Sequence, residues 1–349
     1  MRCTARWLGL LIAGAAACGC SGPSNNVRFR ASEADLVWPG PPDVPRVRYI
    51  GEIRSSADVR GDRSFGEAMG DVLLGKEPPV GMVSPIGVCT DGGDRVFIAD
   101  SNAQVVHVYD LSRNRYTQWT PPKGATPFAQ PIAVTWDPAG RLLVSDAGLG
   151  VVLAFDATGR LLGTLGEHVL ERPCGVAVQP GTGLIGVVDT ASHDVALLDP
   201  GGALHRRIGG RGSDPGRFNF PTHIAFDADG GMYISDSLNF RVQVFQPDGT
   251  FVRAIGRKGD IAGTFAQPKG IAIDPDGHVY VVDANFEAVQ IFDPDGTLLL
   301  AFGREGNGPG EFWLPNGAWF DRTGRLWIAD SYNRRVQVFQ YLSATGDEP

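Results

Sequence analysis

Cysteine is scarce in this chain, and its scarcity narrows the possible chemistry. Five cysteines occur among 349 residues, and three of them lie within the first 20. The other two, Cys89 and Cys174, begin strands of repeats that are two apart, so we expect small buried thiols with no disulfide between them. No CxxCH motif is present, which excludes covalently bound c-type haem. HExxH, GxSxG and Cys/His clusters are also missing, so no such motif assigns a hydrolytic activity.

Long apolar runs and an excess of positive charge are missing as well. The apolar stretch Trp7–Ala17 is too short to span a membrane as a helix, and no other stretch is long enough. The formal net charge is −8, and removal of Arg2 and Arg6 with the N-terminal segment leaves −10. Nucleic-acid binding is favoured by clustered Lys and Arg. Because this chain is acidic, we expect no nucleic-acid partner.

The first residues have the organisation of a targeting signal. Two arginines precede a short apolar stretch, and small residues lead to a cysteine. The run Ala15-Ala16-Ala17-Cys18 is similar to a bacterial lipobox, which predicts a lipoprotein signal peptide at 1–17 and lipidation of Cys18. Cys20 is the alternative acceptor, and an ordinary signal peptide cleaved near Ala17 is the alternative to lipidation. A lipid anchor would be the only attachment to the membrane.

Six copies of one pattern fill most of the chain. Each copy begins at a proline, and an aspartate closes its second apolar run. The aspartates are spaced by 46, 43, 47, 47 and 47 residues and are Asp100, Asp146, Asp189, Asp236, Asp283 and Asp330. A period in the forties with several short strands per unit is typical of β-propeller blades. We therefore predict an all-β, six-bladed β-propeller with four-stranded antiparallel blades.

The fourth copy shows how one repeat forms four strands. Its apolar runs predict strands at Ile224–Phe226, Met232–Ser235, Arg241–Phe245 and Phe251–Ile255. Turns that contain glycine join the first two strands and the last two. The repeat aspartate ends the second strand before a turn, where an Asp side chain caps backbone N–H groups. We interpret the six aspartates as structural residues rather than as metal ligands.

The sixth copy lacks an outer strand, and the missing strand lies upstream. Val47–Ile53 has the pattern of an outer strand and is predicted to pair with Val336–Phe339. This pairing closes the ring and removes an open sheet edge. The propeller would then span residues 46–342, preceded by a flexible tether at 18–45 and followed by a disordered tail at 343–349.

The connection between Ile53 and Pro85 is longer than the others and carries an insertion at 54–80. Apolar residues at helical spacing and an S-x-x-E capping box predict one short helix near residues 64–75. We expect this helix to pack over the mouth of the central channel or beside it. The alternative position is the groove between the last and the first blade.

Three motifs in the last copies carry a family resemblance. P-x-G-I-A-x-D, G-x-(I/V)-Y-(I/V)-x-D and D-S-x-N-x-R-V-Q-V-F resemble the NHL repeat, and with the lipobox the chain is similar to NHL-repeat lipoproteins of Gram-negative bacteria. The resemblance implies a propeller that serves mostly as a binding platform. It also implies an outer-membrane lipoprotein of the cell envelope, periplasmic or surface-facing, with secretion as the alternative. Some relatives are enzymes, which implies the alternative of a metal-dependent lyase or hydrolase acting at the channel.

The residues that follow the repeat prolines are expected to face the central channel. Only His223 among them is an imidazole and none is a carboxylate. Zinc needs three or four N, S or O ligands and calcium needs more oxygens, so we expect no metal, no cofactor and no catalytic residue. The predicted ligand-binding site is the channel mouth, made of His223, Lys269, Asn316, Thr222 and Cys174. We predict that a protein or an extracellular polymer binds the face formed by the loops that cross between blades.

Overall fold

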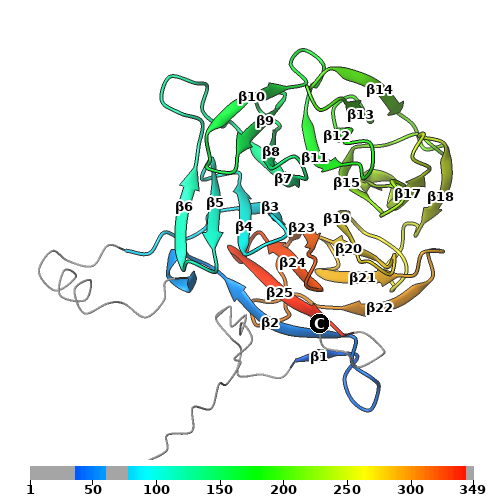
Figure 1. The fold of residues 1–349 in the computed structure, drawn as a ribbon. Coiled ribbons are helices and arrows are strands. Elements are labelled where there is room, and N and C mark those ends of the chain that lie inside the picture. Colours follow the sequence, from blue (N-terminus) through cyan, green and yellow to red (C-terminus); the bar gives the residue numbers. More distant parts are fainter. Residues whose placement is uncertain (1–35, 60–77, 343–349) are drawn as a thin grey trace, which may run out of the picture.

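Six antiparallel sheets surround a central axis in the computed structural model, which describes residues 36–59 and 78–342 (Figure 1). The innermost strand of each sheet contacts its counterparts in the two neighbouring sheets, and these strands form a closed ring. They are β3 (Pro85–Thr90), β7 (Pro131–Asp137), β11 (Pro173–Val178), β15 (Pro221–Phe226), β19 (Pro268–Ile273) and β23 (Pro315–Phe320). The prediction of an all-β, six-bladed propeller is confirmed.

Each blade adds strands outward from this ring, as the repeat predicts. Blade 1 adds β4 (Arg95–Asp100), β5 (Val105–Asp110) and β6 (Arg115–Trp119); blade 2 adds β8 (Arg141–Asp146), β9 (Val151–Asp156) and β10 (Leu161–Leu165); blade 3 adds β12 (Ile185–Asp189), β13 (Asp194–Leu198) and β14 (Leu204–Gly209); blade 4 adds β16 (Met232–Asp236), β17 (Arg241–Phe245) and β18 (Phe251–Ile255); blade 5 adds β20 (Val279–Asp283), β21 (Ala288–Phe292) and β22 (Leu298–Phe302); blade 6 adds β24 (Arg325–Asp330) and β25 (Arg335–Tyr341). In blade 4 two strands are longer than expected, because β15 already begins at Pro221 and β16 ends one residue later, at Asp236.

Blade 6 is completed from the N-terminal side, as predicted. Strand β2 (Val47–Ile53) pairs with β25, with Tyr49 opposite Phe339 and Ile53 opposite Val336. A buried ion-pair network adds to this junction, because the Arg335 guanidinium binds Asp330 at 2.7 Å and Glu52 at 2.8 Å. The closing strand is therefore held by backbone pairing and by charge.

The tether is shorter than predicted, and blade 6 has five strands rather than four. Val37–Trp38 forms β1 and pairs with β2 at the outer edge of the blade. The Trp38 ring lies 5.3 Å from the Phe302 ring and 5.9 Å from the Phe339 ring. An aromatic anchor therefore holds this part of the expected tether against the propeller. Residues 18–35 lie outside the described residues.

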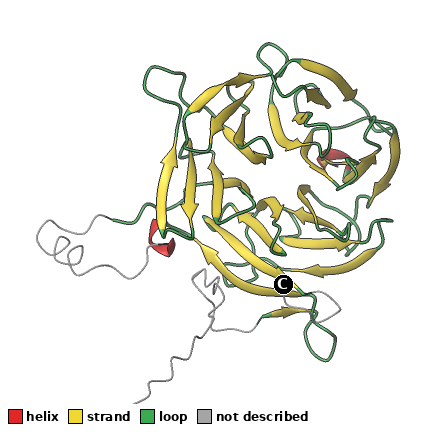
Figure 2. Ribbon diagram, viewed as in Figure 1, coloured by secondary structure: helices red, strands yellow, loops and turns green. Residues whose placement is uncertain are grey.

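The predicted helix near residues 64–75 and the tail at 343–349 also lie outside the described residues. The start of the insertion is described and forms a short 3₁₀ helix, η1 (Ser56–Val59), against β5 and β6. A second 3₁₀ turn, η2 (Ser237–Asn239), follows β16, and strands make up nearly all other regular structure in the described chain (Figure 2). No helix in this described part is long and apolar enough to cross a membrane.

The repeat aspartates hold the loops that cross between blades. Each is fully buried and accepts hydrogen bonds from backbone N–H groups just before the repeat proline of its own blade; Asp283, for example, binds the N–H groups of Ala266 and Gln267 at 2.8 and 2.9 Å. In blade 4 the Arg241 Nε also donates to Asp236 at 2.8 Å. Through these hydrogen bonds the aspartates position the crossing loops around the channel.

Candidate functional site

The first candidate site is the crossing-loop end of the channel, where the loops enter the inner strands. At the first position after each repeat proline the side chain is half-buried, although the proline itself is buried. Blades 1 to 3 place mainly apolar residues there, and blades 4 to 6 place polar ones; the six residues are Ile86, Ile132, Cys174, Thr222, Lys269 and Asn316.

Glycines one residue further make this end of the channel narrow. A Cβ atom on Gly175 would lie 2.7 Å from the Cα of His223 in the next blade, and a Cβ on Gly87 would lie 2.6 Å from the Ile132 carbonyl oxygen. Gly270 contacts the next inner strand in the same way. Real side chains do not fit at such distances, so glycine allows the backbones of neighbouring inner strands to converge. Blades 2 and 4 are the exceptions, because Ala133 and His223 occupy this position.

His223 lies at this constricted level of the channel and is half-buried. Its Nδ1 atom is sealed from solvent and has no hydrogen-bond partner within the described residues. Burial lowers the pKa of His223 to about 3, and the nearby Lys269 charge adds to the shift. The ring is therefore neutral at physiological pH and carries an unused polar atom, which is costly in a buried place.

Lys269 brings a cation into the same region. Burial lowers the pKa of its ammonium, and among the described groups only an ionised Cys174 would favour the charge. Burial also raises the pKa of Cys174, so this thiol is neutral when Lys269 is charged. No described side chain forms an ion pair or a hydrogen bond with the ammonium. Cys174 belongs to blade 3 and Lys269 to blade 5. Because the two groups interact electrostatically although blade 4 lies between them, both lie near the axis.

Most of the predicted mouth residues therefore meet, but they are not equally available. Cys174, His223 and Lys269 lie together, and Asn316 lies on the inner strand next to that of Lys269. The Thr222 hydroxyl is 2.7 Å from the Ser237 hydroxyl, which in turn donates to the Pro268 carbonyl, so Thr222 is tied to the interface between blades. Cys174 is half-buried rather than fully buried as expected, whereas Cys89 is buried, and both are free thiols.

The donor set at this end does not fit a divalent metal. It offers one imidazole, one amide and one thiol around an ammonium group, whose positive charge opposes a second cation. The described chain contains one compact group of potential ligands, Asp274, Asp276 and His278, in the hairpin between β19 and β20. There the Asp274 carboxylate already accepts the N–H groups of Asp276 and His278 and binds the His278 ring at 2.8 Å. Those contacts are turn chemistry.

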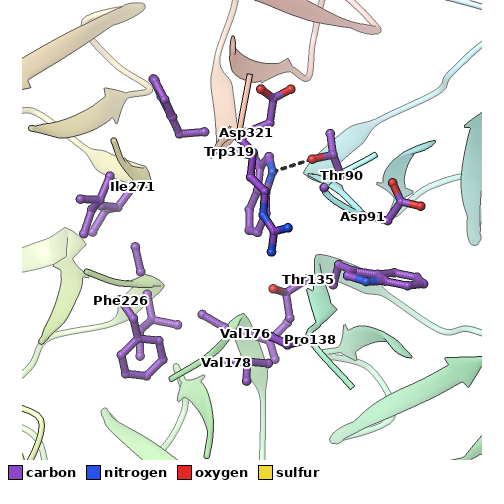
Figure 3. Close-up of a pocket in the computed structure, with 18 residues that line it drawn as sticks. Thr90, Asp91, Thr135, Pro138, Val176, Val178, Phe226, Ile271, Trp319 and Asp321 are labelled. Atoms are coloured by element: carbon purple, nitrogen blue, oxygen red, sulfur yellow. Dashed lines mark hydrogen bonds between the residues drawn. The ribbon is translucent and has the colours of Figure 1, made fainter. Parts of the chain in front are cut away.

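A second candidate site, not predicted from the sequence, lies at the opposite end of the same channel. A cavity of about 490 Å³ opens where the inner strands reach the hairpins, and all six blades contribute to its wall (Figure 3). Blades 3 to 5 supply an apolar side that includes Val176, Phe226 and Ile271, and Trp319 stands on the other side with its Nε1 donating to Thr90 Oγ1 at 3.1 Å.

The sequence does carry one signal for this cavity. Four residues after the repeat proline, five blades have a small residue, and only blade 6 has a large aromatic residue, Trp319; the small residues are Cys89, Thr135, Ala177, Ala225 and Ala272. A single bulky residue at a position that is otherwise small marks a break of the six-fold pattern close to the axis.

Comparisons with known proteins agree with this architecture. A family model described as the SMP-30/gluconolactonase/LRE-like region matches residues 87–302, and a model described as a six-bladed β-propeller matches residues 275–345. No curated protein matches the sequence of the chain. The matching models carry these descriptions and not that of the NHL repeat, so the NHL resemblance stays a prediction.

Solved structures share the fold at low sequence identity. Virginiamycin B lyase from Staphylococcus aureus is 15% identical over 74% of this chain and 96% of its own, with a TM-score of 0.55. A gluconolactonase from Xanthomonas campestris is 17% identical over 75% of this chain and 87% of its own, with a TM-score of 0.58. An auxiliary nutrient binding protein from Bacteroides thetaiotaomicron is 12% identical over 75% and 70%, with a TM-score of 0.59. Because the first family model spans more than half of the chain, this six-bladed propeller belongs to the SMP-30/gluconolactonase/LRE-like family.

Proposed function

We propose that this protein is a lipid-anchored binding protein of the cell envelope that holds a protein or an extracellular polymer against its crossing-loop face. The observation that carries the proposal is the half-buried Lys269 ammonium at the channel mouth, which no described residue neutralises. A bound partner would supply the missing negative charge through a carboxylate or a similar oxyanion.

The energetics favour an anionic ligand group at this position. A cation that is partly removed from water loses hydration free energy, and its pKa falls because nothing nearby compensates. A ligand carboxylate beside Lys269 would restore the balance and form a charge-assisted hydrogen bond. The neutral His223 ring and the Asn316 amide add hydrogen-bonding groups on the two inner strands that flank the strand of Lys269.

The surface around the mouth is suited to a large partner. Exposed apolar side chains gather in the crossing loops and in the turns after the second strands, which lie on the same face; they are Phe220, Leu238, Ile261, Trp313 and Tyr332. The Trp313 and Tyr332 rings lie 5.4 Å apart, and the Phe220 ring lies 4.5 Å from the His193 ring. Exposed apolar patches with aromatic residues mark interaction surfaces.

The decisive experiment tests whether components of a cell-envelope fraction bind to the protein when one lysine of the protein is replaced. Immobilised wild-type protein is compared with Lys269→Met, and Lys258→Met is the matched control, since Lys258 stands on the same face with its Nζ 5.0 Å from the Phe240 ring centre. We expect a salt-sensitive protein or acidic polymer that wild type and Lys258→Met retain and Lys269→Met loses. Equal retention by all three proteins would contradict the proposal.

The anchor is a separate part of the proposal and has its own test. Cys18→Ser is expected to release the protein from membranes, with Cys20→Ser as the control. Release by Cys20→Ser alone would move the lipid to Cys20. Release by neither variant would remove the lipid anchor and leave the secreted form as the alternative localisation.

An enzymatic function is the second candidate, because the family name and two of the similar folds refer to a lactonase and a lyase. The donor set around Lys269 argues against the metal-dependent form of this function. Metal analysis of the purified protein combined with a lactone-hydrolysis assay separates the two functions. Stoichiometric zinc or calcium together with turnover that a chelator abolishes would establish the enzyme.

A further inference from the structure

We propose that the hairpin end of the channel is a second binding site, specific for a small monocarboxylate with an apolar body. The site is the cavity of about 490 Å³ at the hairpin end, and it shares no residue with the candidate site at the crossing-loop end. Its size suits an aromatic or medium-chain acid rather than a polymer.

The cavity has an apolar wall and a polar wall that face each other. Val176, Val178, Phe226, Ile271 and Ile273 form the apolar wall from blades 3 to 5, and Figure 3 shows the labelled members of this set opposite Thr90, Asp91 and Trp319. A ligand with an apolar ring or chain would cover the first wall and stack against the Trp319 indole. Binding would remove apolar surface of both the wall and the ligand from water, which favours the complex.

One hydroxyl in the cavity wall points into the cavity without a partner among the described residues. Thr135 is 3% exposed, and its hydroxyl makes no hydrogen bond to any described residue. Figure 3 shows this hydroxyl directed toward the interior of the cavity. The hydroxyl of Thr90, a residue with the same exposed fraction, by contrast accepts a hydrogen bond from the Trp319 indole. The Thr135 hydroxyl faces the cavity and is unpaired, so it can donate a hydrogen bond to a ligand oxygen.

The charge at the rim selects an anion. Arg322 lines the cavity, is exposed, and forms no ion pair with a described residue. Its guanidinium carbon would lie 3.4 Å from a Cβ atom on Gly92, so it stands close to the blade 1 hairpin. Two carboxylates also line the cavity, but each is already neutralised: Arg95 binds Asp91 at 2.7 Å, and Arg325 binds Asp321 at 2.8 Å. Arg322 is left to pair with a ligand carboxylate in the two-bond geometry that guanidinium groups favour.

The test compares acids with a matched alcohol in titration calorimetry. Phenylacetate, 4-phenylbutyrate and decanoate are titrated into the wild-type protein, with 4-phenyl-1-butanol as the neutral counterpart of the second acid. We expect at least one acid to bind with 1:1 stoichiometry, and 4-phenylbutyrate to bind roughly tenfold more tightly than its alcohol. Absence of binding by all three acids, or equal affinity for acid and alcohol, would overturn the proposal.

Variants locate the site. Arg322→Gln should remove the preference for the acid and leave the affinity for the alcohol unchanged, whereas Arg160→Gln is the matched control, an exposed hairpin arginine paired with Asp156. Val178→Phe should fill the cavity and abolish binding of both compounds, with a melting curve to show that the fold is intact. Acid binding that survives both Arg322→Gln and Val178→Phe would place the ligand elsewhere. Lys269→Met should have no effect here, so this test fails or succeeds independently of the crossing-loop proposal.

Discussion

The two ends of the channel are built from the same six strands and differ in almost every physical property. At the crossing-loop end, glycines such as Gly175 and Gly270 let the backbones converge, and an uncompensated cation is held in the narrow space. At the hairpin end, the same strands enclose a cavity of about 490 Å³ with an exposed arginine at its rim. The channel is therefore a constriction at one end and a pocket at the other, although the same six inner strands line both.

Removal of the closing strand should destroy both ends together. Deletion of residues 44–53 takes away β2, its pairing with β25 and the Glu52 partner of the buried Arg335. Loss of one partner of a buried ion pair alone costs about 3–5 kcal/mol, and the exposed edge of β25 adds to this. We expect no cooperative thermal transition by circular dichroism. Deletion of 343–349 is the control and should leave the melting midpoint nearly unchanged; an unchanged midpoint in the first deletion would contradict the closure.

A side chain at the constriction should damage the crossing-loop end first. Gly270→Val places a branched side chain against the Asn316 carbonyl of the next inner strand, and we expect a loss of roughly 3 kcal/mol in the free energy of unfolding. Gly81→Ala is the control, because a Cβ atom there would have its nearest neighbour at 3.9 Å. Urea denaturation measures both. Equal stability of Gly270→Val and wild type would show that the strands are not in close contact at this level.

The neutral His223 should make stability depend on pH in one direction. Its pKa is about 3 in the folded protein and about 6.5 when unfolded, so the unfolded chain binds the extra proton between these values. Stability should therefore fall as the pH decreases from about 6.5 toward 3, by at most about 1.4 kcal/mol per pH unit. His223→Gln should remove this slope, whereas the exposed His205→Gln should keep it. Identical slopes in wild type and His223→Gln would mean that the imidazole is not buried as a neutral ring.

Replacement of Lys269 should change the stability of the protein least, although it should remove binding of the partner at the crossing-loop face. Because burial lowers its pKa in the folded state, the unfolded chain holds the proton more tightly just below the ordinary lysine pKa. The wild type should therefore gain stability as the pH rises toward about 10.5. Lys269→Met should lack this rise and should be as stable as wild type or more stable by about 1 kcal/mol at neutral pH. A clear loss of stability in this variant would point to a structural partner for the ammonium.

Local patterns of sequence determined the architecture of this protein. The spacing of prolines and aspartates predicted the six blades, the apolar runs predicted the strands of blade 4, and the pattern of Val47–Ile53 predicted the closing strand. These features depend on side-chain alternation and turn residues within one repeat, which are visible in a short window. The grouping of His223, Lys269 and Asn316 also followed from their place after the repeat prolines.

Only the tertiary structure decided which of these residues lack partners and where the channel is open. Strand β1 spans two residues, too few for a pattern, and Trp38 holds it through contacts with Phe302 and Phe339 that are distant in sequence. The hairpin-end cavity needs one wall from blades 3 to 5 and another from blades 6, 1 and 2. Whether Arg322 is free depends on Arg95 and Arg325 occupying the neighbouring carboxylates. Such properties arise from the convergence of all six blades on one axis, and no single repeat contains them.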